Sequence, residues 1–469
     1  MTRIPRALLL PPLPSGEGIG RPPRRARCRG SIFIAASWVL IALAAMCLVL
    51  AQQMRVEVLA SGNRLAQMQA DAVERGGEQY VLSQIDGSNG DAVTVCSQFG
   101  GPLQVGDGYF WVIAANPDNP QQYTYGITDE AGKISLNSAS ATILENLPNM
   151  TSDVAASIVA WRSTTTTAQT SDDNSYYQGL PQPYQCKMNP FESIEELLLV
   201  RGVAGQTPDL LFSYDSNHNG VIDAAELSSG GMASQINAAQ NGALGLFPLV
   251  TCFSVEPNTG ASGSARVDIN LPGSPRLSTL LQKTLAAARV RSIVNLANRG
   301  RPFRNIFDFA VRTGMSSTEF ATIANSITTS TGTTLTGLVN VNTASAQVLA
   351  CLPGLTASDA QALVAKRQTN TTTMGIAWVL EALGSTKAVG VGSMITGRSF
   401  RFSADIVGVS GDGRAYKRVR IVADSTQSPP KLLYRKDLTD LGWPLDPADR
   451  ELLRRGQPPS GIVTLSGGT

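Results

Sequence analysis

The feature that most constrains this chain is an uncharged, apolar segment near its start. No charged residue stands between Arg29 and Arg55, and most residues from Ser31 to Met54 are Ala, Leu, Ile or Val. The run is long enough to cross the hydrocarbon core of a bilayer as a helix, which takes about 20 residues. A signal peptide has a shorter apolar core of about 7–15 residues and a small-residue cleavage site. The run therefore predicts a membrane-spanning helix.

The segment before the apolar run is strongly basic. Its single acid is Glu17. An excess of arginine keeps a flanking segment on the cytoplasmic side of a membrane, so we expect a single-pass protein whose bulk lies on the far side. The basic residues are Arg3, Arg6, Arg21, Arg24, Arg25, Arg27 and Arg29.

A helical pattern continues beyond the apolar run. One helix over residues 31–85 would be about 80 Å long at 1.5 Å per residue. Its first half would be apolar on all sides and its second half amphipathic, which predicts a helical segment within residues 31–90. The apolar residues at helical spacing in the second half are Val56, Leu59, Met68, Val73, Val81 and Leu82.

Two β-rich stretches, residues 91–136 and 387–437, flank a long helical block. Turn residues at Asp129–Gly132 and Gly411–Gly413 predict hairpins. We expect the two stretches to pair into one split antiparallel sheet, while the C-terminal tail, residues 438–469, has no clear place in it. The candidate strands are Ala92–Phe99, Gly108–Asn116, Gln122–Leu136, Arg398–Asp424 and Lys431–Asp437.

An internal repeat organises the helical block, residues 137–386. Residues 134–162 and 339–367 align without a gap and share 12 of 29 residues. Each copy predicts two helices joined by a tight hairpin, in which a proline, Pro148 or Pro353, ends the first helix. The predicted N-caps are Asn137 or Ser138 and Asn342 or Thr343 for the first helices, and Thr151 and Thr356 for the second.

The repeat is a helix-hairpin-helix pattern, which is best known for binding nucleic-acid backbone. Glycine-flanked amides at a helix start hold a phosphate in that version of the motif. The two hairpins here read LPNM and LPGL, and neither turn carries a basic residue. We therefore favour a structural or protein-binding role and expect no nucleic acid.

A calcium loop is predicted at residues 215–226. The stretch matches the EF-hand pattern D-x-[DN]-x-[DN]-G-x5-E, in which Gly220 allows the sharp turn. Ca²⁺ is a hard cation that takes six or more oxygen ligands around one point. An Asn/Asp-rich turn without metal is the alternative. The predicted ligands are Asp215, Asn217, Asn219, the carbonyl of Val221, Asp223 and Glu226.

Residue usage argues against an enzyme. The chain has one histidine, His218, and it lies inside the predicted calcium loop. Ser-His-Asp, Cys-His and HExxH sites would all have to use it. One or two disulfides or unpaired buried thiols are both open, because four cysteines allow three pairings. Those four are Cys96, Cys186, Cys252 and Cys351.

Three distant segments resemble one family. A basic leader that ends in Gly30 before a two-part helix is similar to type IV pilins and pseudopilins, in which a prepilin peptidase cuts after the glycine, here between Gly30 and Ser31. Ala35 stands where most of these proteins carry glutamate. The stretches NVNTAS…LPGL and DDNSYYQGLPQPY…NPFESIEELLLVRGV complete a resemblance to protein K of the type II secretion system.

The resemblance implies an α+β fold and a role without catalysis. We expect a pilin-like long N-terminal helix packed on a small antiparallel sheet, with a large helical insertion that holds two SAM-like units. Residues 1–30 would be the prepilin leader in the cytoplasm. The protein would sit in the inner membrane, with its bulk in the periplasm, and cap the pseudopilus. Its partners would be minor pseudopilins I and J, with H and the major pseudopilin G below.

Two other functions remain open from the sequence. The hairpin repeats are compatible with a DNA-uptake protein of competence systems, and a pilin-like start with a calcium loop is compatible with a type IV pilus tip adhesin. A membrane-anchored hydrolase has no supporting set of residues.

Overall fold

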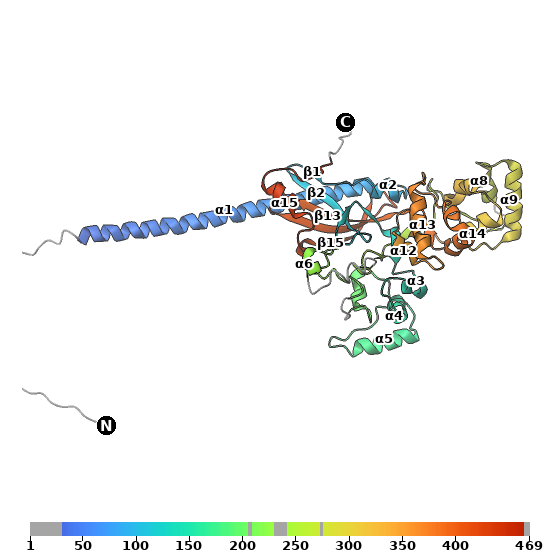
Figure 1. Ribbon diagram of the computed structural model, residues 1–469, viewed down its shortest axis with the longest axis horizontal. Helices are drawn as coiled ribbons and strands as arrows, with labels where there is room; N and C mark the ends of the chain where they lie inside the picture. Colours follow the sequence, from blue (N-terminus) through green and yellow to red (C-terminus); the bar gives the residue numbers. More distant parts are fainter. Residues whose placement is uncertain (1–30, 205–208, 229–241, 273–274, 464–469) are drawn as a thin grey trace, which may run out of the picture. The chain divides into compact units, whose positions relative to one another are not determined.

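A computed structural model describes residues 31–204, 209–228, 242–272 and 275–463 (Figure 1). The leader, residues 1–30, including the predicted processing residue Gly30, lies outside the described residues. Contacts divide the chain into two units, which meet in sequence between Gly62 and Asn63.

The first unit is the apolar half of helix α1 (Ser31–Ile85), and the predicted helix over residues 31–85 is confirmed. Every described side chain from Ile32 to Ser61 is exposed, among them Phe33, Trp38 and Leu43. By length and composition α1 is able to cross a membrane, and it is the one helix of the described chain that can.

The second unit is built on an antiparallel sheet of seven strands. Its main order is β1-β2-β13-β14-β15, while β3 pairs with β2 and β4 pairs with β13. The sheet therefore joins strands from both sides of the helical block, as expected. The strands are β1 (Leu103–Val105), β2 (Gly108–Ala115), β3 (Tyr123–Tyr125), β4 (Thr128–Asp129), β13 (Arg401–Val409), β14 (Tyr416–Asp424) and β15 (Lys431–Asp437).

The second half of α1 packs on one face of this sheet. Val73, Val81 and Ile85 lie in one apolar cluster with inward-facing strand residues such as Phe110. The approach is close at Gly408 of β13, where an added Cβ would lie 2.5 Å from the backbone nitrogen of Glu74. Only glycine fits there, because the obstructing atoms are helix backbone.

Helix α2 (Ala92–Cys96) corrects one predicted strand, Ala92–Phe99. The Asp91 carboxylate accepts a hydrogen bond from the Thr94 backbone N–H at 3.1 Å and caps the helix. This cap outweighs the strand preference of the Val-Thr-Val run. Ala92 and Val95 then face the core.

The predicted hairpin at Asp129–Gly132 is also wrong. Glu130–Gly132 form a 3₁₀ turn, η1, in which the Asp129 carboxylate accepts from the Ala131 backbone N–H at 2.8 Å. The strands on either side do not pair, since β4 joins the large sheet while β5 (Ile134–Ser135) pairs with β6 (Val250–Thr251).

The insertion contains three short parallel strand pairs, one more than the sequence repeat suggested. They are β5–β6, β8 (Val267–Asp268) with β9 (Ile327–Thr328), and β11 (Val339–Asn340) with β12 (Ile395–Thr396). A separate antiparallel pair joins β7 (Val255–Pro257) to β10 (Thr334–Thr336).

An asparagine follows the first strand of each parallel pair and ties down a distant segment. Asn137 and Asn270 each bond both the backbone N–H and the carbonyl of one phenylalanine, Phe191 and Phe303 respectively. Asn342 instead donates to the carbonyls of Gly375 and Gly397. The three pairs therefore share one packing device.

This device explains why the predicted caps of the first repeat helices are wrong. Ser140 and Ser345 cap them instead, because the two asparagines are engaged elsewhere and the Thr343 hydroxyl donates to Asp129. Thr151 and Thr356 cap the second helices as predicted.

Short helices make up the rest of the insertion. They are α3 (Ala141–Glu145), α4 (Ser152–Arg162), α5 (Ala168–Gln178), η2 (Ile194–Leu199), α6 (Ala224–Ser228), α8 (Pro275–Gln282), α9 (Ala287–Gly300), α10 (Ile306–Arg312), α11 (Ser317–Ile323), η3 (Ala324–Ser326), α12 (Ala346–Ala350), α13 (Ala357–Gln368) and α14 (Val379–Val391).

The C-terminal tail has a place on the sheet after all. Beyond η4 (Thr439–Leu441), Leu453 of helix α15 (Pro447–Arg454) packs in a cluster with Trp111 and Val407, on the side chains of β2 and β13 that point away from α1. Val463 then bridges to Leu103 of β1. The tail covers sheet surface that would otherwise expose aromatic residues.

The cysteines that the structure describes are all unpaired. Cys186 and Cys351 are buried, and Cys96 and Cys252 are half-buried. The sequence left disulfides and free thiols open, and the second alternative holds in the described part of the chain.

Replacing Gly408 by alanine should loosen the contact between α1 and the sheet. The new methyl group would meet helix backbone that cannot rotate away, so overpacking should cost about 1–3 kcal/mol. Thermal unfolding of the full-length protein in detergent measures the loss. Gly100→Ala is the matched control, since nothing lies near its would-be Cβ; equal midpoints for both variants would contradict the close approach.

Candidate functional site

The predicted calcium loop is folded against the sheet side of the head. Ile222, at its centre, is 1% exposed and packs with Ala243 and Leu244. Its backbone N–H donates to the carbonyl of Pro120 at 2.7 Å. Pro120 belongs to the connection between β2 and β3. The loop is therefore held by packing and by backbone contacts from outside its own sequence.

Backbone donors curl the loop around Asp215. The buried Asp215 carboxylate accepts from the N–H groups of Asn219 at 2.9 Å and Gly220 at 2.8 Å. Gly220 has a φ of +95° and His218 a φ of +60°, which the sharp turn requires and which glycine adopts without strain. His218 stacks on Phe212.

Glu226 closes the loop from its far end. Its carboxylate accepts from the backbone N–H of Asn217 at 3.2 Å and of Asp223 at 3.0 Å. The Asp223 carboxylate in turn accepts from the Asn217 side-chain amide at 2.8 Å. Asn219 accepts from the N–H of Val221 at 2.9 Å. The side chains of the predicted set are thus linked within one loop.

The donor chemistry of the loop fits a hard cation. All predicted ligands are oxygens, of which three are carboxylates, two are amide oxygens and one is a backbone carbonyl. No group of three or more His, Cys, Asp or Glu side chains within the described ranges is placed to hold a metal. A site here would therefore depend on the asparagines and the carbonyl of Val221 as well.

Burial leaves the loop with poorly solvated negative charge. Burial raises the pKa of Asp215 to about 7, and the nearby charge of Glu226 adds to the rise. Two carboxylates that repel each other in a buried place favour a positive partner. A bound cation would relieve this cost.

A buried charge cluster lies behind the loop, on the strands. Arg418 and Arg420 of β14 both bond the carboxylate of Asp405 on β13, with contacts of 2.5 to 2.7 Å. Burial by itself would raise the pKa of Asp405, but the two guanidinium groups outweigh it and hold that pKa at about 2. No sequence pattern indicates this cluster, because its members lie on strands that are brought together only by the pairing of β13 with β14.

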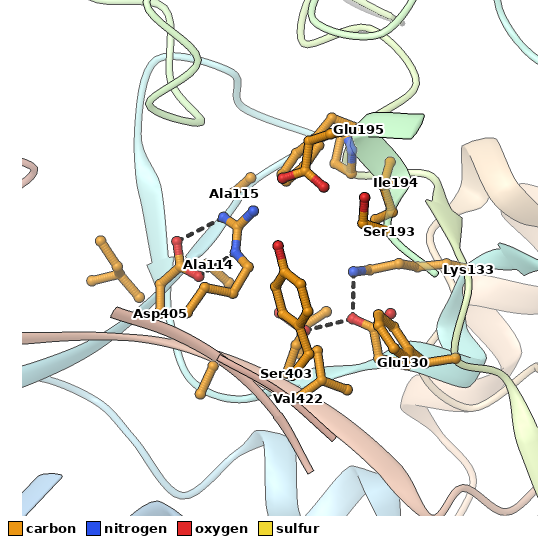
Figure 2. A pocket seen from close by; sticks show the side chains of 18 residues that line it. Ala114, Ala115, Glu130, Lys133, Ser193, Ile194, Glu195, Ser403, Asp405 and Val422 are labelled. Atoms are coloured by element: carbon orange, nitrogen blue, oxygen red, sulfur yellow. Dashed lines mark hydrogen bonds and ion pairs between the residues drawn. The ribbon is translucent and has the colours of Figure 1, made fainter. Parts of the chain in front are cut away.

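A cavity between the sheet and the insertion adjoins the same cluster (Figure 2). Figure 2 shows Glu130, Lys133 and Ser403 on one side, Asp405 on the other, and Glu195 across from them. Lys133 pairs with Glu130 at 2.7 Å and Glu195 pairs with Lys436 at 2.6 Å. These charged groups are held by partners, so the cavity is a polar junction between the two parts of the head.

The two hairpins of the repeat meet each other. The Asn146 side chain donates to the carbonyl of Cys351 at 3.0 Å, and the Cys351 thiol donates to the carbonyl of Asn146 at 3.3 Å. These residues occupy the same position in the two repeats and cap the C-termini of α3 and α12. The repeats therefore pack as a reciprocal pair through helix ends that carry partial negative charge.

The structure describes one of the two predicted processing residues, Ser31. Ser31 begins α1, and Gly30 is outside the described residues. Sequence reasoning did not find the residues outside the loop that form hydrogen bonds with it, which are Pro120, Tyr123 and Arg418.

Acid should remove the stabilisation that Asp405 supplies. Its pKa is lower in the folded state than in the unfolded chain, so this stability is present above about pH 4. It is lost as the pH falls toward 2. Asp405→Asn should lack this acid-dependent loss and should cost about 3–5 kcal/mol at neutral pH, because the buried Arg418 and the half-buried Arg420 lose their shared carboxylate.

Urea unfolding from pH 7 to pH 2 measures both effects. Asp437→Asn is the matched control, since Asp437 also has a pKa of about 2 but pairs with Lys417 at the surface, where an ion pair contributes no more than about 1 kcal/mol. An acid profile of Asp405→Asn that runs parallel to that of the unchanged protein would refute the assignment.

Comparisons with known proteins give a family match and structural matches. Residues 339–386 match the family model described as Type II secretion system (T2SS), protein K. No curated protein matches the chain. A chain from the crystal structure of the GspK-GspI-GspJ complex of the enterotoxigenic Escherichia coli type 2 secretion system is 12% identical, over 82% of this chain and 99% of that one, with a TM-score of 0.34.

That TM-score is too low to support an argument about fold or partners, so the family match alone carries weight. It covers β11, α12 and α13, the second copy of the repeat, and most of α14. The resemblance that the sequence predicted is therefore confirmed on residues 339–386, which match the protein K family of the type II secretion system.

Proposed function

We propose that this chain is a minor pseudopilin at the tip of the type II secretion pseudopilus. It initiates assembly of the pseudopilus and supports protein export across the outer membrane. It is anchored in the inner membrane by α1, with its bulk in the periplasm, and its role requires no catalysis. The observation that carries the proposal is the protein K family match together with an N-terminal helix whose apolar half is uncovered.

The exposed half of α1 needs a cover. A surface of large apolar side chains from Ile32 to Leu59 is unstable in water. Lipid covers it while the protein is anchored, and neighbouring helices of the same kind cover it in a filament. α1 is a continuous helix through this region, so its backbone groups are satisfied in both surroundings.

Ala35 supports the proposed position of this chain at the tip of the pseudopilus. Pilins of the resembling family carry a glutamate in place of this alanine, which pairs with a neighbouring subunit above. An unpaired carboxylate within the apolar core would be costly. A subunit with alanine at this position loses nothing when no subunit lies above it.

The size of the insertion supports the same place. It connects β4, which ends at Asp129, with β13, which begins at Arg401. A head of this size would obstruct close stacking if it recurred at every level of a filament. We propose minor pseudopilins I and J as the direct partners, with H and the major pseudopilin G below them.

The hairpin contact disfavours the DNA-uptake alternative. The reciprocal contact of Asn146 with Cys351 directs the two hairpins toward each other, and neither turn carries a basic residue that would attract phosphate. We therefore propose that the repeats serve packing within the head. Tight, salt-dependent binding of duplex DNA in a gel-shift experiment would contradict this.

We also propose that the loop 215–226 holds one Ca²⁺ as a structural ion. Three carboxylates and a fold that is already curled around Asp215 support it. Bound calcium would neutralise negative charge and fix the connection between the loop and the sheet.

Replacing Gly30 by a bulky residue such as leucine should block cleavage by the prepilin peptidase. The uncut chain should keep its arginine-rich leader, stay in the membrane and abolish secretion of a reporter cargo. Mass spectrometry of the purified protein gives the N-terminus. Arg21→Leu, in the same leader but away from the proposed cut, is the control; a normal N-terminus and normal secretion in the Gly30 variant would overturn the processing step.

Removing calcium should lower the melting midpoint of the full-length protein. Ligand bound only by the folded state contributes about 2.7 kcal/mol at a hundredfold excess over Kd. Differential scanning calorimetry in EGTA and in millimolar CaCl₂ measures the difference. Asp215→Asn should abolish it and Asp107→Asn, an exposed residue of the β1–β2 turn, should not. An identical midpoint in both buffers would count against the ion.

A further inference from the structure

Two side chains of the sheet bond the same backbone oxygen of the loop 215–226, the carbonyl of Asn219. The Tyr123 hydroxyl of β3 donates to it at 2.7 Å, and Nη2 of Arg418 on β14 donates to it at 3.0 Å. This carbonyl belongs to a residue whose side chain is a predicted ligand. Its two donors come from strands far away in sequence.

Burial of the Arg418 guanidinium group costs desolvation free energy. Its side chain is 1% exposed, and its Nε is buried without a partner in the described structure. Asp405 is shared with the half-buried Arg420, so one carboxylate serves two guanidinium groups. A buried positive charge that is only half compensated is unfavourable unless other negative groups lie near.

The loop supplies that negative charge. It contains three carboxylate side chains, those of Asp215, Asp223 and Glu226. The charge of Arg418 acts on Asp215 in the favourable direction. The guanidinium is also fixed to the loop by geometry, because the carbonyl of Asn219 accepts its hydrogen bond.

Tyr123 completes the arrangement. The guanidinium carbon of Arg418 lies 5.5 Å from the centre of the Tyr123 ring, and Nη1 donates to the Tyr123 hydroxyl at 3.4 Å. Tyr123 is also the residue of β3 that pairs with Ala115 of β2. One side chain therefore touches the sheet ladder, the buried arginine and the loop.

We propose that Tyr123 and Arg418 are positioning residues for the ion. They hold the loop in the conformation that binds calcium, and they link calcium binding to strand β3. This inference rests on the proposed calcium site. By holding the Asn219 carbonyl, the two donors keep the adjoining turn at Gly220 and the Asp215 contacts in place before the ion arrives. Calcium in turn stabilises β3, because loop and strand share these contacts.

Tyr123→Phe tests the proposal, since it removes one hydroxyl and leaves the ring and the buried charges in place. A hydrogen bond contributes about 1 kcal/mol, and binding weakens when the competent shape is less populated. We expect Ca²⁺ affinity to fall by about fivefold. Isothermal titration of the full-length protein with CaCl₂ measures it. Arg418→Met should weaken binding further where it still folds.

Tyr125→Phe is the matched control. Tyr125 lies on the same strand as Tyr123, and both line a groove beside the loop. The Tyr125 hydroxyl makes no hydrogen bond to the described part of the loop. Its affinity should equal that of the unchanged protein.

Hydrogen exchange gives a readout that a merely structural tyrosine would not move. Calcium should slow amide exchange across Tyr123–Tyr125 in the unchanged protein and in Tyr125→Phe, and this slowing should be largely lost in Tyr123→Phe. An unchanged protein that binds no calcium overturns the proposed ion site itself. Calcium binding with equal affinity and equal exchange protection in Tyr123→Phe overturns only the positioning role.

Discussion

The pairing of β2 with β13 is the interaction on which the rest of the head depends. It aligns Ile113 with Asp405 and Tyr109 with Val409, although almost three hundred residues separate them. Closing so long a loop costs conformational entropy, but that cost grows only slowly with length, so the large insertion can be accommodated. The pairing creates the apolar face that receives the second half of α1. It also brings Asp405 to Arg418 and Arg420, and Arg418 in turn bonds the loop 215–226.

The sequence predicted the elements whose causes are local. The long helix, the hairpin helices with Thr151 and Thr356 as caps, and the alternation in β13 and β14 follow from residue type and spacing. The strand predicted at Ala92–Phe99 was wrong because of the local Asp91 cap, whereas other errors arose where a distant segment intervened. Asn137 resembles a cap but bonds Phe191, and the turn after Asp129 joins two different sheets. The loop motif was visible because its spacing is local, whereas Tyr123 and Arg418 were not, because strand pairing brings them together.

Ion pairs connect helix α1, the sheet and the insertion. Glu74 on α1 is buried and pairs with Arg435 of β15, while Lys436 of the same strand reaches Glu195 in the insertion. Asp405, Asp215 and Glu226 are further buried acids of the head. Each such group is costly unless partnered. Together they favour one arrangement of helix, sheet and insertion.

The central claim is that this subunit occupies the end of the pseudopilus. Immunogold labelling of an epitope in the insertion, on pseudopili assembled by cells that overproduce the major subunit, tests it most directly. The account predicts gold at one end of each fibre and none along the shaft. Gold spaced regularly along the fibres would contradict it.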